Sequence, residues 1–520
     1  MRAALLVVMA LLGSCHFFAG LRPCEVNVDC AAGEACSSGV CGPAAGEDEG
    51  ENSEGEGEGG EGEGEGEGEG EGEGEGEGEG EGEGEGEGEG EGEGEGEGEG
   101  ELSALGCERA TPAFDDCDPL RDPFGGGDGT TDNPFRICTA AQLEAVGGSS
   151  SFVLTVDIDL DEPWVQIPAL RGDAIFDGQG FEIRGLLMST SGSAFVNEVL
   201  DRAAIEHLDF VQPHIAGSQN VAVVAQNVAA GARITDVHVI GGEVSATLGN
   251  SGGLVVSLNG TLDHCSFSGS VTNAVAGPAV GETASGKVGG LAKTVSATAL
   301  VTHARFSGDI QNNADQTGGI AGQLDGHIEN VEVVSFTMGS RTRMGGIAGT
   351  AVGGAVVDTV VVRGSIGADS PKGASAQVRL GGLFGQLLFE RASEEVRVVD
   401  ALVEVQVSSR DSNSDEVDPL VGVEESRADA GTEQTRGVLT FCHSAYSSSD
   451  GPSQPRRIVG DALVDGAGTP GPCDGDGDQL FLLEPDVILA GEQPPLDVWA
   501  TDVDEWDVAP GEPPLLKFCP

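Results

Sequence analysis

The chain has 520 residues, of which 89 are Asp or Glu and 25 are Lys or Arg, so its formal net charge is −64. Nucleic acids and anionic membranes are bound by basic surfaces, so this charge excludes the ordinary modes of nucleic-acid binding and a basic helix on a membrane surface. The length would allow about three domains, but the composition changes so much along the chain that each segment has to be taken by itself.

Residues 1–14 predict a lipoprotein-type export signal. An apolar run follows Arg2 and ends at Leu12, which is too short for a bilayer-spanning helix of about 20 residues but typical of the apolar part of a signal peptide. The run ends in Leu-Gly-Ser-Cys15, which resembles the lipobox of bacterial lipoproteins. That resemblance implies acylation of Cys15 and a lipid-anchored location in the cell envelope, at the outer membrane or the cell surface. A plain secretory signal with a chance cysteine is the alternative.

Residues 15–46 predict a small disulfide-rich module. Cys24, Cys30, Cys36 and Cys41 are separated by small polar residues, and a segment with so few core-forming side chains needs covalent staples. Three pairings are open, and zinc is disfavoured because Cys-x-x-Cys spacing is missing. The segment resembles Cys-rich modules that follow lipoboxes in exported bacterial proteins. Other disulfide candidates are Cys107, Cys117, Cys138, Cys442, Cys473 and Cys519, while Cys265, isolated within a repeat, is predicted to be unpaired.

Residues 47–101 predict a disordered acidic Glu-Gly linker. This stretch contains 28 acidic residues, no basic residue and almost no apolar side chain. Burial cannot offset the entropy of ordering such a chain, and its charges repel one another. We expect it to act as a stalk that holds the following domain away from a membrane; the alternative is low-complexity sequence of no selected length.

The remainder is dominated by an internal repeat. Two small residues, an aliphatic residue, any residue and a small or apolar residue form a five-residue box at 252–256, 289–293, 318–322, 345–349 and 381–385. Successive boxes are separated by 37, 29, 27 and 36 residues, with weaker copies at 192–196, 219–223 and 418–422. We therefore predict repeats over 191–450, opening and capping coils over 102–190, and a C-terminal capping segment over 451–520.

Each box is followed by a phrase of alternating polar and apolar residues, such as 262–271 and 301–310. Strands are indicated by the period of two, by the β-branched residues and by the glycines that separate the alternating segments. No segment of the region has the 3.6-residue period of a helix. Several short strands in units of about 30 residues predict an all-β fold, a right-handed parallel β-helix with coils about 4.8 Å apart. A β-propeller is disfavoured, because it expects longer units with aromatic signatures.

The box and phrase resemble the GLUG repeat of bacterial surface proteins. Residues 135–143 resemble the opening strand and short helix of that family, residues 157–160 and 176–186 its first coils, and residues 498–517 its closing phrase. The resemblance implies a right-handed β-helix displayed outside the cell, often without a known activity. Some members are adhesins, and the repeat also accompanies a zinc peptidase that cleaves immunoglobulin. The zinc-binding motif His-Glu-x-x-His of such a peptidase does not occur in this sequence. Lys293 and the long polar unit at 382–450 depart from the family pattern.

A polar residue recurs at the third position of the phrase. In chain order these residues are His207, Asp236, His264, His303, Asn330 and Thr359. Equivalent positions stack in a β-helix, so we expect a structural column at a coil corner that bonds otherwise unpartnered backbone groups. A metal or acid–base role is disfavoured, because catalysis needs a single distinct constellation.

Other motifs are weak. Asp474, Asp476 and Asp478 begin like a calcium loop, but Gln479 and Pro485 stand where that loop needs Gly and Glu. The Gly-x-Ser-x-Gly pattern at 249–253 overlaps a repeat box and predicts a coil turn rather than a nucleophile loop. Single Asp and Glu residues are plentiful, but no column of them at equivalent positions with a partner base is apparent. We therefore expect no catalytic residue, no cofactor and no metal, with calcium as a weak candidate.

These features predict a non-enzymatic, lipid-anchored cell-surface protein for adhesion or envelope structure. The alternative is a β-helix that binds or cleaves polysaccharide, which would use carboxylates clustered in a groove. The expected partners are a membrane, through the N-terminal lipid, and a surface glycan or protein, without nucleic acid. The chain is expected to be monomeric.

Overall fold

The computed structural model describes residues 34–37, 40–43, 105, 107, 111–189, 193–274, 286–312, 315–340, 342–368, 378–391, 394–409, 416–426, 438–442, 444–447, 480–482, 506–507 and 514–518. The chain divides into two units, Met1–Glu93 and Gly94–Pro520. In the first unit, β1 (Glu34–Ser37) and β2 (Val40–Pro43) pair antiparallel, with Cys36 opposite Cys41 in the strand register.

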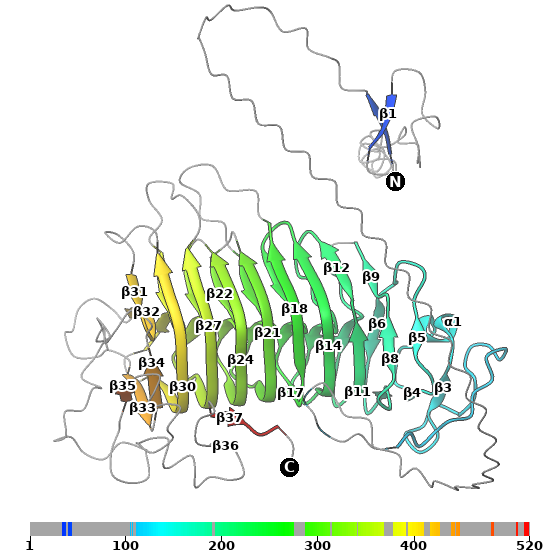
Figure 1. The fold of residues 1–520 in the computed structure, drawn as a ribbon. Helices are drawn as coiled ribbons and strands as arrows, with labels where there is room; N and C mark the ends of the chain where they lie inside the picture. The colour runs from blue at the N-terminus through cyan, green and yellow to red at the C-terminus, as the bar shows by residue number, and fades with distance from the viewer. Residues whose placement is uncertain are drawn as a thin grey trace, which may run out of the picture. The chain divides into compact units, whose positions relative to one another are not determined.

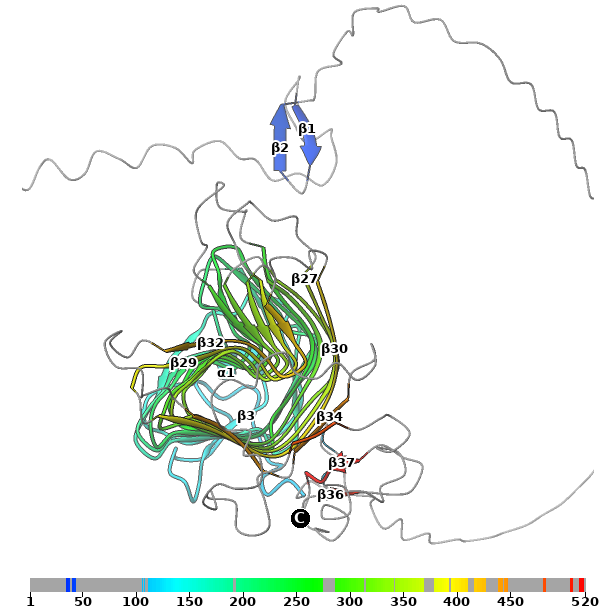
Figure 2. The ribbon, with the colours of Figure 1, turned by 90° about the vertical axis from the view of Figure 1, so that its left-hand side faces the viewer.

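Parallel sheets built from successive coils form the second unit (Figures 1 and 2). The nine-stranded sheet contains β6 (Ile167–Leu170), β10 (Val196–Val199), β13 (Ala225–Val228), β16 (Val255–Leu258), β20 (Ala292–Val295), β23 (Ala321–Leu324), β26 (Ala348–Val352), β29 (Phe384–Phe389) and β32 (Val421–Ser426). The six-stranded sheet contains β15 (Asn250–Gly252), β19 (Lys287–Gly289), β22 (Gln316–Gly318), β25 (Arg343–Gly345), β28 (Arg379–Gly381) and β31 (Glu416–Asp418).

The largest sheet of the described residues has eighteen strands. Its N-terminal part contains β3 (Phe135–Ile137), β4 (Phe152–Leu154), β5 (Ile158–Asp159), β7 (Ile175–Asp177), β8 (Glu182–Arg184), β9 (Leu187–Met188), β11 (Ala204–Val211), β12 (His214–Gly217) and β14 (Arg233–Ala246). It continues through β17 (Thr261–Asp263), β18 (Ser266–Asn273), β21 (Leu300–Asn312), β24 (His327–Ser340), β27 (Val356–Ala368), β30 (Glu395–Ser409), β33 (Val438–Cys442), β34 (Ser444–Ser447) and β35 (Leu480–Leu482).

Each strand pairs in parallel with the equivalent strand of the next coil. In the nine-stranded sheet, for example, Val255 lies beside Ala292, Ala292 beside Ala321 and Ala321 beside Ala348. The prediction of an all-β parallel β-helix is therefore confirmed, and the radial blades of a propeller are excluded.

Among the described residues, one short helix, α1 (Ala140–Glu144), follows β3 near the N-terminal end of the coils (Figure 1). No helix of the described residues is both long enough and apolar enough to cross a membrane.

The five-residue box is the turn between the six-stranded and nine-stranded sheets. Its first glycine ends one strand, such as Gly318 at the end of β22, and β23 begins two residues after the second glycine, Gly319. A Cβ atom on Gly319 would overlap the carbonyl oxygen of Gly346 in the next coil and the side chain of Val333 in β24. The glycines therefore recur because this turn brings backbone against backbone from coil to coil.

One apolar core runs through the stacked coils. Alternate residues of each phrase point inward, as Phe267 and Val271 do in β18, and both are buried. Near the N-terminal end, Phe195 lies among Trp164, Phe176 and Phe210, with ring centroids 5.4, 5.7 and 5.2 Å away. The same alternation leaves the intervening side chains on the outer surface, where the functional candidates lie.

Candidate functional site

The predicted polar column lies at one corner of successive coils. His207, Asp236, His264, His303, Asn330 and Thr359 all have φ between 47 and 51°. The strand register on either side aligns each of them with the next, and the same corner continues to Asp400, with φ of 46°. A left-handed residue is needed here because the strand bends, and Asn, Asp and His tolerate this conformation best. Sequence reasoning missed Asp400, although the box at 381–385 precedes its unit, because the stretch between this box and the corner is longer than in the preceding units.

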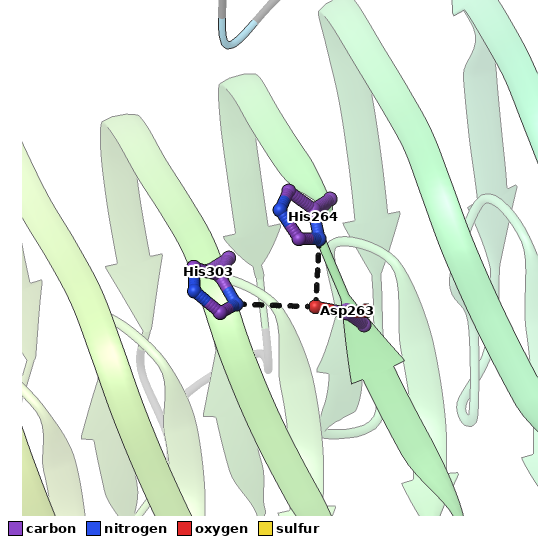
Figure 3. A group of neighbouring side chains, drawn as sticks. All are labelled: Asp263, His264 and His303. Atoms are coloured by element: carbon purple, nitrogen blue, oxygen red, sulfur yellow. Dashed lines mark hydrogen bonds and ion pairs between the residues drawn. The ribbon is translucent and has the colours of Figure 1, made fainter. Parts of the chain in front are cut away.

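Two neighbouring members of this column converge on one carboxylate (Figure 3). Asp263 ends β17 and His264 follows it, while His303 lies one coil further along in β21. The Nδ1 atoms of His264 and His303 lie 2.8 and 3.3 Å from Oδ1 of Asp263. The two imidazoles are stacked, with centroids 4.4 Å apart and planes inclined by 9°. The three side chains are partly exposed.

The shared carboxylate sets the electrostatics of this cluster. Burial raises the pKa of Asp263, but the hydrogen bonds from His264 and His303 outweigh it and hold that pKa below its usual range. The hydrogen bond to Asp263 raises the pKa of His264, against the opposing effect of burial. Asp263 therefore stays ionised, and its negative charge favours a cationic group beside it.

A simpler version of the same arrangement occurs three coils earlier. Nδ1 of His207 lies 3.0 Å from Oδ1 of Asp177, and no second imidazole stacks on His207 among the described residues. The hydrogen bond to Asp177 raises the pKa of His207, while burial lowers it less strongly. This pair is a natural control for the cluster of Asp263, His264 and His303.

We expect the pKa of His207 to lie above its ordinary value of about 6.5 and to fall toward that value in an Asp177→Asn variant. Because the folded-state pKa is raised, the pair stabilises the fold below about pH 6.5, and this contribution is lost as the pH rises through the folded-state pKa. An NMR titration of the histidine rings measures it, with His207→Asn identifying the signal. An unchanged titration midpoint in Asp177→Asn would contradict the expectation.

The C-terminal strap, residues 514–518, lies across the outside of the coils beside the column. Its backbone accepts hydrogen bonds from Arg363 at Pro514 (2.7 Å) and from Asn330 at Lys517 (3.0 Å), and the Leu516 N–H donates to Glu332 (3.1 Å). The guanidinium of Arg305 lies over the ring of Phe518, 4.9 Å from its centroid. The strap therefore crosses at least three coils perpendicular to their strands.

An apolar cluster holds the strap in place. Leu516 and Phe518 are buried with Trp506, Val361 and Leu402, the last two on the outer side of β27 and β30. Within the strap, β37 (Leu515–Leu516) pairs antiparallel with β36 (Trp506–Asp507). The described parts of the predicted capping segment thus include β35, which extends the large sheet, and this strap along the side.

The described cysteines divide into bonded and free. Cys117 and Cys138 form a disulfide, and Cys107 is also disulfide-bonded. Cys265 is a free thiol with no exposed surface, and burial raises its pKa to about 12, so it is protonated and unreactive at neutral pH. Cys442 lies in β33. Outside the described residues lie Cys15, Cys24, Cys30, Cys473, Cys519 and the calcium candidates Asp474, Asp476 and Asp478.

Two carboxylates occupy equivalent positions in adjacent coils. Glu329 and Asp358 lie side by side in the register of β24 and β27, one residue before the corner in adjacent coils. Burial raises the pKa of Asp358, and the negative charge of Glu329 raises it further. Each of the two directly precedes its corner residue, so the alignment of Asn330 with Thr359 in the sequence already places them at one position.

The far half of the large sheet presents a polar outer surface, which we call the distal polar face. One column consists of Ser270, Asp309, Thr337, Ser365 and Gln406, each beside the next in the register of β18, β21, β24, β27 and β30. A second column, two residues further along the strands, contains Thr272, Gln311, Gly339, Gly367 and Ser408. Asp309, Thr337 and Gln406 are exposed. Figure 1 shows these strands side by side.

No protein-family model matches the sequence, and no curated protein matches it. Among solved structures, the chain is similar to a putative immunoglobulin A1 protease from Bacteroides ovatus, with 14% identity, a TM-score of 0.37, and coverage of 76% of this chain and 96% of that one. A second similar structure, named IgA1 protease, has 15% identity, a TM-score of 0.33 and coverage of 57% of this chain. The chain spans 20% of that second protein. Similarity this low assigns no function.

Proposed function

We propose that this chain is a non-enzymatic surface protein whose β-helix makes adhesive or structural contacts in the cell envelope. The observation that supports this proposal is the distal polar face, where short hydroxyl, amide and carboxylate side chains repeat from coil to coil. Equivalent groups about 4.8 Å apart can each make a weak contact with a repetitive ligand. Such contacts add up when they are held on one rigid scaffold.

The N-terminal segment is part of the same proposal as a tether, which consists of a lipid on Cys15 and the acidic stretch at 47–101. A lipid on Cys15 would anchor the chain, and the acidic stretch at 47–101 would carry the β-helix away from the membrane. The ligand class that fits the face is a surface glycan or an extended protein segment, because both offer repeated hydrogen-bonding groups. The tether and the face are tested separately, since one concerns location and the other contact.

Surface biotinylation of cells that produce the full chain tests the location. The proposal expects the β-helix to be labelled on intact cells and Cys15→Ala to release it from the membrane fraction. Binding of the purified chain to a glycan array and to envelope proteins tests the contact. Thr337→Lys should weaken binding, whereas Ala297→Lys, at a residue that is also exposed but lies outside the distal polar face, should not. Labelling only after cell lysis, or equal binding by both variants, would contradict the proposal.

One observation favours a second function, the cleavage of a polysaccharide. Glu329 and Asp358 are paired carboxylates in adjacent coils, and the pKa of Asp358 is raised. Two carboxyl groups about 5 Å apart, one of them with a raised pKa, are the arrangement that retaining glycosidases use. Release of reducing ends from envelope polysaccharides that is lost in Asp358→Asn would establish this function in place of the first.

A further inference from the structure

The cluster of Asp263, His264 and His303 brings three metal-ligating side chains together on the outside of the coils (Figure 3). One ligand atom from each side chain lies within 4.8 Å of the others. The side chains keep 31, 26 and 34% of their surface exposed, so an ion can reach them from solvent. We propose that these residues form a binding site for one divalent cation of the zinc class. This site is distinct from the distal polar face.

The distances within the cluster are close to those of a zinc site. Bonds of about 2.0–2.2 Å in a tetrahedron place neighbouring ligand atoms about 3.3–3.5 Å apart. The two Nδ1 atoms lie 2.8 and 3.3 Å from Oδ1 of Asp263. The two rings are stacked with their planes inclined by only 9°, so one imidazole must turn before both nitrogen lone pairs can point to one ion among the three ligand atoms. The fourth position would then face solvent.

The His264 ring is also held from a second direction. It makes a hydrogen bond to the backbone of Phe518 in the C-terminal strap, in addition to its contact with Asp263. In metal-binding histidines, the N–H of one ring nitrogen commonly donates a hydrogen bond to a backbone carbonyl. This bond orients the other ring nitrogen toward the ion. Nδ1 of His303 lies 3.0 Å from the hydroxyl of Thr302, which would have to give up this contact when an ion binds to that nitrogen. Of the two rings, His264 is therefore the one that a second neighbouring group orients.

The donor set selects the class of ion. Two imidazole nitrogens and one carboxylate oxygen suit Zn²⁺, Co²⁺, Ni²⁺ and Cu²⁺, whereas Ca²⁺ and Mg²⁺ prefer oxygen ligands only. This difference separates the site from the many carboxylates elsewhere in the acidic chain, which would bind hard cations loosely. This inference replaces the expectation from sequence that the chain binds no metal.

The repeat supplies substitutions that the fold accepts. Asn330 occupies the position equivalent to His303 in the next coil, and Thr302 the position equivalent to Asp263. His303→Asn and Asp263→Thr should therefore remove ligands without disturbing the corner. His207→Asn makes the same change at a corner where a single histidine contacts a carboxylate, and it is the matched control.

The experiment measures zinc binding to the full chain by calorimetry, with millimolar calcium present to occupy the loose carboxylate sites. Cobalt is added separately, because four-coordinate Co²⁺ gives a visible absorption spectrum that loose binding does not. We expect one zinc equivalent that weakens at least about tenfold in His303→Asn and Asp263→Thr, together with loss of the cobalt spectrum. His207→Asn should retain both. Unchanged zinc binding in the first two variants, or an equal loss in His207→Asn, would overturn the proposal, and melting curves establish that each variant is folded.

Discussion

Replacing Gly319 by Ala should lower the free energy of unfolding by about 3 kcal/mol. The new methyl group would overlap the carbonyl oxygen of Gly346 and Cγ1 of Val333, and neither can retreat, since one belongs to the backbone of the next coil and the other to the core. The turn between the two smaller sheets would have to open. Because every coil stacks on its neighbours, the displacement would spread to the adjacent coils.

Gly367→Ala is the matched control for this change. It also adds one methyl group to a strand of the stack, but the nearest neighbour of that methyl group would be Oγ of Ser408 at 3.4 Å, an ordinary contact with a movable side chain. Urea unfolding followed by circular dichroism gives both midpoints. A Gly319→Ala midpoint that equals that of Gly367→Ala would show that the coils are not as tightly stacked as described.

Replacing Phe195 by Ala should cost about 3–5 kcal/mol of unfolding free energy. Phe195 has no exposed surface and contacts Trp164, Phe176 and Phe210, so its removal leaves a cavity where three aromatic side chains meet. Each lost aromatic contact adds about 0.5–1.5 kcal/mol beyond the area that it buries. Phe176 and Phe210 lie in β7 and β11, whose paired backbones fix part of the cavity wall, so little collapse can offset the loss.

Phe195→Leu separates volume from aromaticity at this position. Leucine fills most of the space but forms no ring contacts, so we expect it to recover more than half of the loss that alanine causes. Thermal unfolding of the three chains under one set of conditions makes the comparison. Equal melting temperatures for Phe195→Ala and the unsubstituted chain would place Phe195 outside the core.

The fold could be predicted from the sequence because the β-helix repeats its constraints. The box marks the turn between two sheets, where backbone atoms leave no room for a Cβ atom, as at Gly319. The alternating phrase marks the strands that follow, because inward residues such as Phe306 must be apolar and outward ones such as Ser307 need not be. The box and the phrase recur in each coil, so several weak local patterns together predict the fold more strongly than any one of them.

The candidate site was only partly predictable. The corner positions of His264 and His303 follow from counting within the phrase, but the role of Asp263 depends on which coil lies beside which. The pairing of Glu329 with Asp358 could have been predicted, because each directly precedes one of the aligned corner residues Asn330 and Thr359. Two histidines at the same position of consecutive units, the first preceded by Asp, are the signal that could have identified the cluster.

The C-terminal strap could not be predicted from local sequence at all. Its hydrogen bonds join residues far apart in the chain, such as Glu332 and Leu516, which are separated by 184 positions. Burial of Val361 and Leu402 on the outer side of a strand conflicts with alternation until the strap covers them. Such long-range contacts produce no periodic pattern in the sequence of the strap or of the strands that it covers.

Disulfide trapping across adjacent coils tests most directly that equivalent residues stack in register. Asp309 and Thr337 are exposed partners in β21 and β24, so the pair Asp309→Cys and Thr337→Cys should bridge on mild oxidation. Ser365 lies in the same column but two coils from Asp309, about 10 Å away, so Asp309→Cys with Ser365→Cys should not bridge. Mass spectrometry of the cross-linked peptides distinguishes the outcomes. A bridge in the first pair alone is the predicted result, and a bridge in the second pair alone, in both or in neither would contradict the stacking.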